Sequence, residues 1–207
     1  MEKLKPGNLF AQLFSYILHP LLMATYASII FFNSGHFFSI VNPGIKNTIY
    51  FLFIILTFLV PAILIPPVYF IVISSKKYFN KKRIKLLILA IIEIVYIVVY
   101  YYMNKILMPP VLVNIILSGI VLIGICLIIS AFWNVSIYTC GIGGLLGFTL
   151  NLAIIKNLPV SVVCLFLILC CGIAATARLY LNKHNPKQVY VGILIGLTTV
   201  FGCMLFF

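Results

Sequence analysis

The chain has 207 residues, of which 64% are hydrophobic and 8% are charged, and its mean hydropathy is +1.25. An ordinary soluble domain carries about 25% charged residues, and a disordered chain combines low hydrophobicity with high charge, so both classes are excluded. The composition instead predicts one integral membrane domain over residues 1–207, because about seven spanning helices would use about 140 positions and leave only short loops.

Seven apolar runs follow one another along the sequence, and each of them predicts a helix. A helix of roughly 20 residues crosses the hydrocarbon core of a bilayer, so the expected fold class is all-α, a bundle of six to seven transmembrane helices. The predicted helices cover about residues 10–32, 48–73, 86–103, 111–132, 145–155, 160–177 and 189–207.

Two of these runs contain residues that interrupt a helix. In the first run His19 precedes Pro20. The imidazole is either a functional group inside the membrane or a partner for a carbonyl that the proline leaves free. In the second run Pro61, Pro66 and Pro67 predict a kink or a break, because proline has no N–H and its ring clashes with the preceding turn.

The positive charges are distributed unevenly: 14 Lys and Arg stand against two Glu, which gives a formal net charge of +12. With seven spans, the N-terminus and the stretches 74–85, 133–144 and 177–188 share one side of the membrane. That side carries eleven of the 14 cations, so the positive-inside rule places it in the cytoplasm. The eleven are Lys3, Lys5, Lys76, Lys77, Lys81, Lys82, Arg83, Lys85, Arg178, Lys183 and Lys187, and the other three are Lys46, Lys105 and Lys156.

The same charges bear on partners. In a chain this apolar, basic loops indicate contact with anionic lipid headgroups rather than with nucleic acid. We therefore expect membrane lipids, phosphorylated ones above all, as partners, and no nucleic acid. The composition is rich in Ile, Lys and Asn and is typical of a bacterial protein, which favours the bacterial inner membrane.

Six cysteines lie mostly within the apolar runs, where small buried thiols pack as hydrophobic side chains. They form no Cys-x-x-Cys pair, and no histidine stands at zinc-finger spacing from them. We therefore expect no metal and no cofactor.

Three polar stretches on the basic side carry residue types that suit phosphate chemistry. Arginine presents a planar fork that matches phosphate oxygens, glycines let backbone N–H groups approach an anion, and a histidine beside phosphate can act as a nucleophile. The simpler interpretation is that the cations anchor helix ends and the glycines pack helices. The residues concerned are Lys76, Arg83, Ser136, Gly141, Gly143, Gly144, Arg178 and His184.

The order and spacing of these residues resemble the type 2 phosphatidic acid phosphatase superfamily, which includes the vanadium haloperoxidases. Its motifs read K-x6-R-P, P-S-G-H and S-R-x5-H-x3-D. Here Lys76 precedes Arg83 by seven positions, and Arg178 precedes His184 by six. The second motif is weaker, because the sequence VSIY at 135–138 stands in place of P-S-G-H. The likeness covers about residues 73–207.

The resemblance implies a role for each matching residue. His184 would attack phosphorus as the nucleophile and become a phosphohistidine. Ser136 would donate a hydrogen bond to the phosphate. The phosphate oxygens would be neutralised by Lys76, Arg83 and Arg178.

Two replacements affect the proton-transfer residues of this family. Tyr138 stands where the general-acid histidine belongs, and its ordinary pKa of about 10 is a poor match to neutral pH. Gln188 stands where an aspartate orients the nucleophile. An amide can accept the imidazole N–H, but it brings no charge to stabilise an imidazolium.

We therefore hypothesise a membrane protein that binds a lipid phosphate head group where the basic loops converge, with impaired catalysis. One alternative is an active lipid phosphatase that uses His184 on an isoprenoid or glycerolipid phosphate. A second is a transporter-like protein or a structural subunit of a membrane complex, for which His19, Glu93 and the proline-broken second helix are the motivating features. Many members of the superfamily act on the outer face of the membrane, which would place the motifs in the periplasm, whereas the charge rule places them inside.

Overall fold

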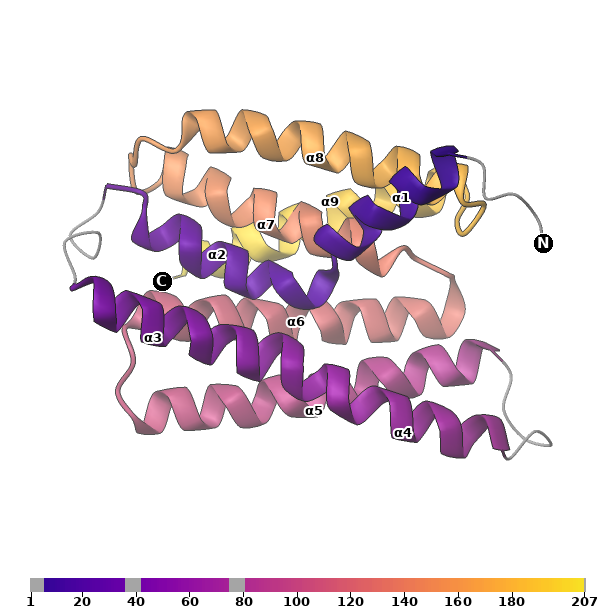
Figure 1. The fold of residues 1–207 in the computed structure, drawn as a ribbon. Coiled ribbons are helices and arrows are strands. Elements are labelled where there is room, and N and C mark those ends of the chain that lie inside the picture. Colours follow the sequence, from indigo (N-terminus) through magenta and orange to yellow (C-terminus); the bar gives the residue numbers. More distant parts are fainter. Residues whose placement is uncertain (1–5, 36–41, 75–80, 207) are drawn as a thin grey trace.

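The computed structural model describes residues 6–35, 42–74 and 81–206. Within these ranges the chain is helical and contains no strand. Figure 1 shows the long helices running alongside one another as one bundle. The elements are α1 (Pro6–Ile17), η1 (Pro20–Leu22), α2 (Met23–Phe32), α3 (Pro43–Phe53), η3 (Ile54–Leu59), α4 (Val60–Ser74), α5 (Lys81–Lys105), α6 (Pro110–Phe132), α7 (Ile137–Ile154), α8 (Ser161–Tyr180) and α9 (Pro186–Leu205).

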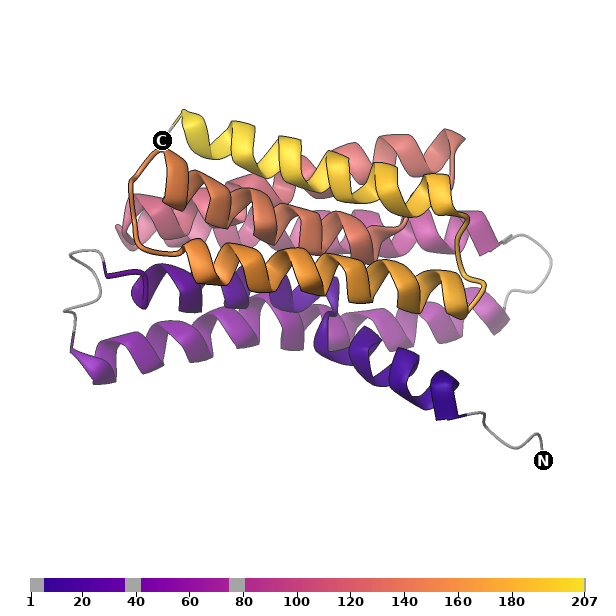
Figure 2. The ribbon, with the colours of Figure 1, turned by 90° about the horizontal axis from the view of Figure 1, so that it is seen from above.

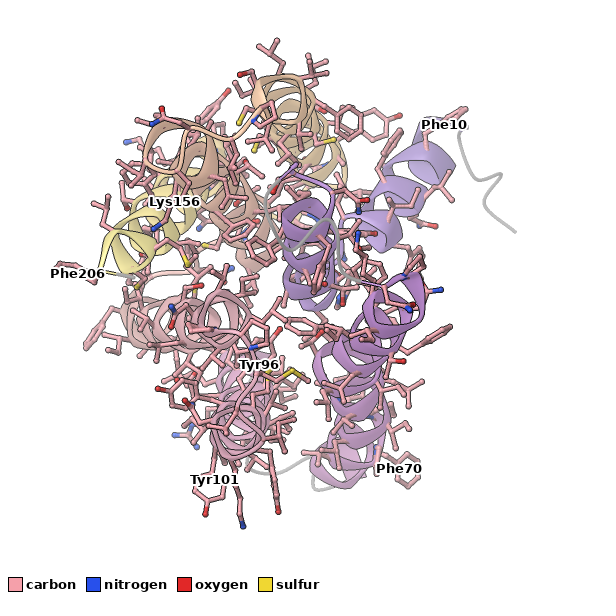
Figure 3. All side chains as sticks on the ribbon, turned by 90° about the vertical axis from the view of Figure 1, so that its left-hand side faces the viewer. Phe10, Phe70, Tyr96, Tyr101, Lys156 and Phe206 are labelled. Atoms are coloured by element: carbon pink, nitrogen blue, oxygen red, sulfur yellow. The ribbon has the colours of Figure 1, made fainter. Side chains whose placement is uncertain are left out.

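The predicted all-α transmembrane bundle is confirmed. Seven helical segments of the described ranges are long and apolar enough to cross a membrane, at residues 10–32, 43–70, 82–105, 110–132, 137–154, 161–180 and 186–205. Large apolar side chains such as Phe70 and Tyr101 point outward from the bundle (Figure 3), where a bilayer would accept them. The chain is therefore an integral membrane protein by the length and apolarity of its helices.

The first span was predicted as one helix, but it is interrupted at His19 and Pro20, between α1 and α2. His19 has an extended backbone (φ −69°, ψ 133°), and its Nδ1 accepts a hydrogen bond from the Leu21 N–H at 3.3 Å. Pro20 then begins the short 3₁₀ turn η1 that leads into α2. His19 thus caps the start of η1 through its Nδ1.

The second span stays helical through its prolines, so the predicted break is absent. The chain widens instead into the π-helical segment η3, in which the Val60 N–H bonds the Ile55 carbonyl. This wider turn lies directly before Pro61, whose missing N–H cannot continue an α-helical ladder. Pro66 and Pro67 lie inside α4.

The closest helix pair is α7 with α9, and glycines make that approach geometrically feasible. A methyl group at Gly143 would overlap the carbonyl of Ile193, and one at Gly196 would overlap the carbonyl of Cys140. Small residues spaced by four are a common way to bring membrane helices together. Figure 2 shows α7 between α8 and α9.

This packing corrects the expectation of a glycine-rich turn at 141–144 that would cradle phosphate. Those residues are buried inside α7, which begins at Ile137 and not near residue 145. Their function is to pack helices, as the simpler interpretation of the sequence proposed.

The described parts of the three polar stretches converge. The starts of α5, α7 and α9 lie at one end of the bundle, which is also the end where α1 begins (Figure 1). The turn between α7 and α8 and the end of α9 lie at the opposite end.

Candidate functional site

An open cavity of about 610 Å³ lies at the end of the bundle where the polar stretches meet. Its walls come from the first turns of α5 and α7, the last turns of α6 and α8, and the loops that precede α7 and α9. No acidic residue is found among the described residues that line it. The lining residues are Lys82, Lys85, Ser130, Phe132, Asn134, Ile137, Tyr138, Arg178, Lys183 and His184.

Arg178 is the most buried charge of the cavity. It lies in the last turn of α8 and is only 8% exposed. Its Cζ atom stands 3.4 Å from the centroid of the Tyr138 ring, a cation–π contact that holds the guanidinium in one place. Its Nη2 has no hydrogen-bond partner among the described residues. The cavity wall therefore contains a buried hydrogen-bond donor that is held in position and has no acceptor among the described residues.

His184 precedes α9 and is held by the helix start. Its Nδ1 lies 3.0 Å from Oε1 of Gln188, and the same oxygen accepts the Asn185 N–H at 3.2 Å. Asn185 and Gln188 form a capping box at the N-terminus of α9. Because an amide oxygen can only accept, His184 carries its proton on Nδ1 in this arrangement.

The electrostatic surroundings keep the imidazole neutral. Burial lowers the pKa of His184 below its ordinary value, and the positive charges of Lys85 and Arg178 lower the pKa further. The hydrogen bonds with Gln188 and with the Asn134 backbone act in the opposite direction. A neutral ring has one unprotonated nitrogen, and a nucleophilic histidine requires that form.

Lys85 links the start of α5 to the loop before α7. Its Nζ donates to Oδ1 of Asn134 at 2.6 Å and to the carbonyl of Val135 at 2.8 Å. Two hydrogen bonds of this ammonium group therefore join two walls of the cavity. Lys82 and Lys183 are exposed at the mouth and are better placed to attract an anion from outside.

Tyr138 also contacts the broken first span. The His19 ring stands edge-on to the Tyr138 ring, with centroids 5.4 Å apart. Nδ1 of His19 accepts the Leu21 N–H, so this nitrogen carries no proton. The imidazole is therefore in its neutral form, which is not a strong general acid. The sequence alone did not place His19 beside the site, because the contact depends on how the broken span folds back.

The structure brings together four of the sequence-predicted residues, namely Tyr138, Arg178, His184 and Gln188. It does not bring Ser136 to the cavity, because that residue is fully buried and its backbone N–H bonds the Gln188 carbonyl at 3.4 Å.

The cations predicted on α5 are also placed differently. Arg83 is exposed in the first turn of α5, and the cavity wall is formed by its neighbours Lys82 and Lys85. Lys76 lies outside the described residues. Sequence reasoning missed Lys82 and Lys85 because it began the helix at residue 86. A start at Lys81 would have put both on one face at i, i+3 spacing.

Comparison with known proteins adds nothing to this geometry: no family model, no curated protein and no solved structure matches the chain.

Proposed function

We propose that the cavity binds the phosphate head group of a membrane lipid, as the resemblance to the type 2 phosphatidic acid phosphatase superfamily implies. The observation that carries the proposal is the buried Arg178 guanidinium, whose Nη2 has no partner beside a cavity that also contains His184. A buried, unpaired donor on a charged group costs free energy, and a phosphate oxygen would satisfy it.

The charge of the cavity favours an anion of this kind. Lys82, Lys85 and Lys183 add positive charge around the same opening, and the described lining has no acid to neutralise it. A phosphate that enters would meet two exposed lysines first and the fixed guanidinium below them. This arrangement favours rapid capture followed by a directional hydrogen bond.

A lipid is the favoured source of the phosphate. The cavity opens at the end of spanning helices, where headgroups lie in a bilayer. A small apolar cavity of about 90 Å³ inside the bundle shares Ile137 with it.

Hydrolysis is the second candidate, and the orientation of His184 favours it. In that reaction a ring nitrogen of His184 would bond phosphorus while the bond from phosphorus to the lipid oxygen breaks, and the leaving alkoxide would need a proton. The Tyr138 ring lies against Arg178 and carries a hydroxyl, but an ordinary phenol is a weak acid at neutral pH. We therefore propose binding with slow or absent turnover, in a bacterial inner membrane with the cavity on the cytoplasmic side.

The test uses the full chain in lipid nanodiscs, with a panel of isoprenoid and glycerolipid phosphates. Binding and phosphate release are measured on the same samples. We expect Arg178→Gln to weaken binding at least about tenfold, because it removes a hydrogen bond to a charged group. Lys105→Gln removes an equal charge from the opposite end of the bundle and should leave binding unchanged.

Turnover separates the two candidates. Slow release of phosphate that His184→Ala abolishes would establish the phosphatase, and binding without release would establish the binding protein. Equal binding by the wild-type chain and Arg178→Gln would refute both. The side of the membrane follows from labelling Lys183→Cys and Lys156→Cys with an impermeant thiol reagent in intact cells. We expect only the second to react.

A further inference from the structure

The opposite end of the bundle holds a second polar cavity, of about 190 Å³. It lies between α6, α7 and α9 and reaches the turn between α7 and α8. Its polar members are Asn114, Asn151 and Lys156. Figure 3 looks onto this end of the molecule and labels Lys156.

Asn151 is the residue that makes this cavity chemically unusual. Its side chain has no exposed surface, and neither its Nδ2 nor its Oδ1 has a hydrogen-bond partner among the described residues. A buried amide normally finds partners for both atoms, because leaving them unpaired costs free energy. Asn151 belongs to the wall of the cavity, so a rotation of its side chain would bring the unpaired amide to a ligand that fills the cavity.

The side chain is not needed to end the helix. The backbone carbonyl of Asn151 accepts the N–H groups of Ile155 and Lys156, at 2.9 and 3.3 Å, and the turn continues through Asn157 with φ +50°. The last turn of α7 is therefore satisfied by the backbone alone. An apolar side chain of the same size at 151 would leave these backbone bonds in place, so the helix end does not account for the amide.

The other residues that line this cavity limit which kind of ligand it can bind. Asn114 contributes a second buried amide from the first turns of α6, at 7% exposure, and the exposed Lys156 adds a positive charge at the mouth. No acidic residue stands among the described residues of this lining. Apolar walls that include Phe31 and Met204 strengthen any electrostatic interaction inside.

We propose that this cavity binds a phosphate group, held by the amides of Asn151 and Asn114 with the Lys156 ammonium at its mouth. Phosphate fits both atoms of the Asn151 amide: a phosphate oxygen accepts from Nδ2, and the hydroxyl of a hydrogen phosphate donates to Oδ1. A carboxylate lacks that second donor. The source is either inorganic phosphate or a phosphomonoester head group of the other leaflet, and the site is independent of the cavity around Arg178.

The experiment uses the full chain with Arg178→Gln in phosphatidylcholine nanodiscs, so that the other cavity binds phosphate more weakly and contributes less. The unfolding temperature is followed as inorganic phosphate is added. We expect phosphate to raise it, and we expect Asn151→Leu to weaken the apparent affinity at least about tenfold without lowering stability in the absence of phosphate. Lys156→Gln should weaken it several-fold, whereas Lys105→Gln, a charge change at the same end, should not.

Two further arms identify the source and exclude simple solvation. Acetate at equal ionic strength should not stabilise the chain. If stabilisation appears only when phosphatidic acid is added to the disc, and Asn151→Leu removes it, the head group is the source. If no phosphate effect appears in either arm, or if Asn151→Leu leaves it unchanged, the cavity holds water only and the proposal is overturned. Should Arg178→Gln fail to fold, the wild-type chain should show two classes of phosphate site, one of which Asn151→Leu or Asn114→Leu removes.

Discussion

The α7–α9 pair and the span α3–η3–α4 cross the bundle by opposite means. The first relies on glycines, which let the backbone of one helix touch carbonyls of the other. In α7, 67% of the residues are buried. The second contains four prolines and a π-helical segment, and only 22% of the residues in its most apolar stretch are buried. The cavity around Arg178 draws on the first region, because Tyr138 lies in the first turn of α7 and His184 shortly before α9.

The difference shows where this chain keeps its geometry fixed. Close backbone contact leaves no room for helices to slide, so side chains at the ends of α7 and α9 keep their relative positions. A proline-rich helix with an exposed surface adapts more easily, and none of the described residues of α3–α4 lines the cavity. We call the α7–α9 pair the tight region and α3–η3–α4 the loose region. If function depends on the tight region alone, substitutions in the loose region should leave it unchanged.

The largest effect is expected at the glycine contact. Gly196→Ala would push a methyl group into the carbonyl of Cys140, and overpacking of this kind costs about 1–3 kcal/mol of stability. Gly202→Ala on the same helix meets nothing within 4 Å and is the matched control, with no loss expected. Unfolding in mixed detergent measures both. Equal stability of the two variants would mean that the α7–α9 approach is not limiting.

A smaller effect is expected where α7 and α8 meet in the cavity. Tyr138→Leu removes the ring beneath Arg178, and loss of a cation–π contact costs about 0.5–2 kcal/mol. The guanidinium would then be less well fixed, so affinity for lipid phosphate should fall with stability. Tyr138→Phe keeps the ring and should keep both properties. If the two variants lose affinity equally, the hydroxyl of Tyr138 and not its ring supports binding.

The loose region should tolerate a change that also alters the backbone. Pro66→Ala restores an N–H inside α4, and this residue does not belong to the cavity lining. We expect affinity for lipid phosphate within about twofold of the wild-type value, because no contact to the anion changes. A larger loss, measured in the same nanodisc assay, would show that α4 shapes the site after all.

Much of this fold could be predicted from the sequence because apolar run length alone locates a spanning helix. The fifth span was predicted too short for a physical reason. Its first half contains Tyr138, Thr139 and three glycines, which lower the mean hydropathy and look like a loop, although the glycines are buried at a helix contact. The spacing between Arg178 and His184 also predicted their proximity, since it spans one helix end and one short loop.

Other parts of the site could not be predicted. Whether Ser136 or Tyr138 faces the cavity depends on the rotation of the first turn of α7, which is set by its packing on α9. Asn151 gave no signal, because a single Asn in an apolar run has no motif around it. Its importance comes from what surrounds it, and that is a tertiary property.

The smallest effect concerns the protonation of His184. Its pKa is lowered chiefly by burial, so the folded chain binds this proton at lower pH than the unfolded chain, whose histidines titrate near 6.5. As the pH falls below about 6.5, the unfolded state is protonated first and stability declines. The decline ends once the pH has passed below the folded pKa of His184.

Neighbouring groups should move this pKa in opposite directions. Gln188→Leu removes a hydrogen bond that raises the pKa, so it should fall further, whereas Lys85→Gln removes a positive charge and should raise it. Histidine NMR titration measures both, with His184→Ala identifying the resonance. Bound phosphate should also raise the pKa, because an anion beside the ring favours the imidazolium. Added lipid phosphate could instead leave the pKa of His184 unchanged while Arg178→Gln still weakens binding. That result would place the phosphate on Arg178 at a distance from His184, and it would rule out the nucleophilic role.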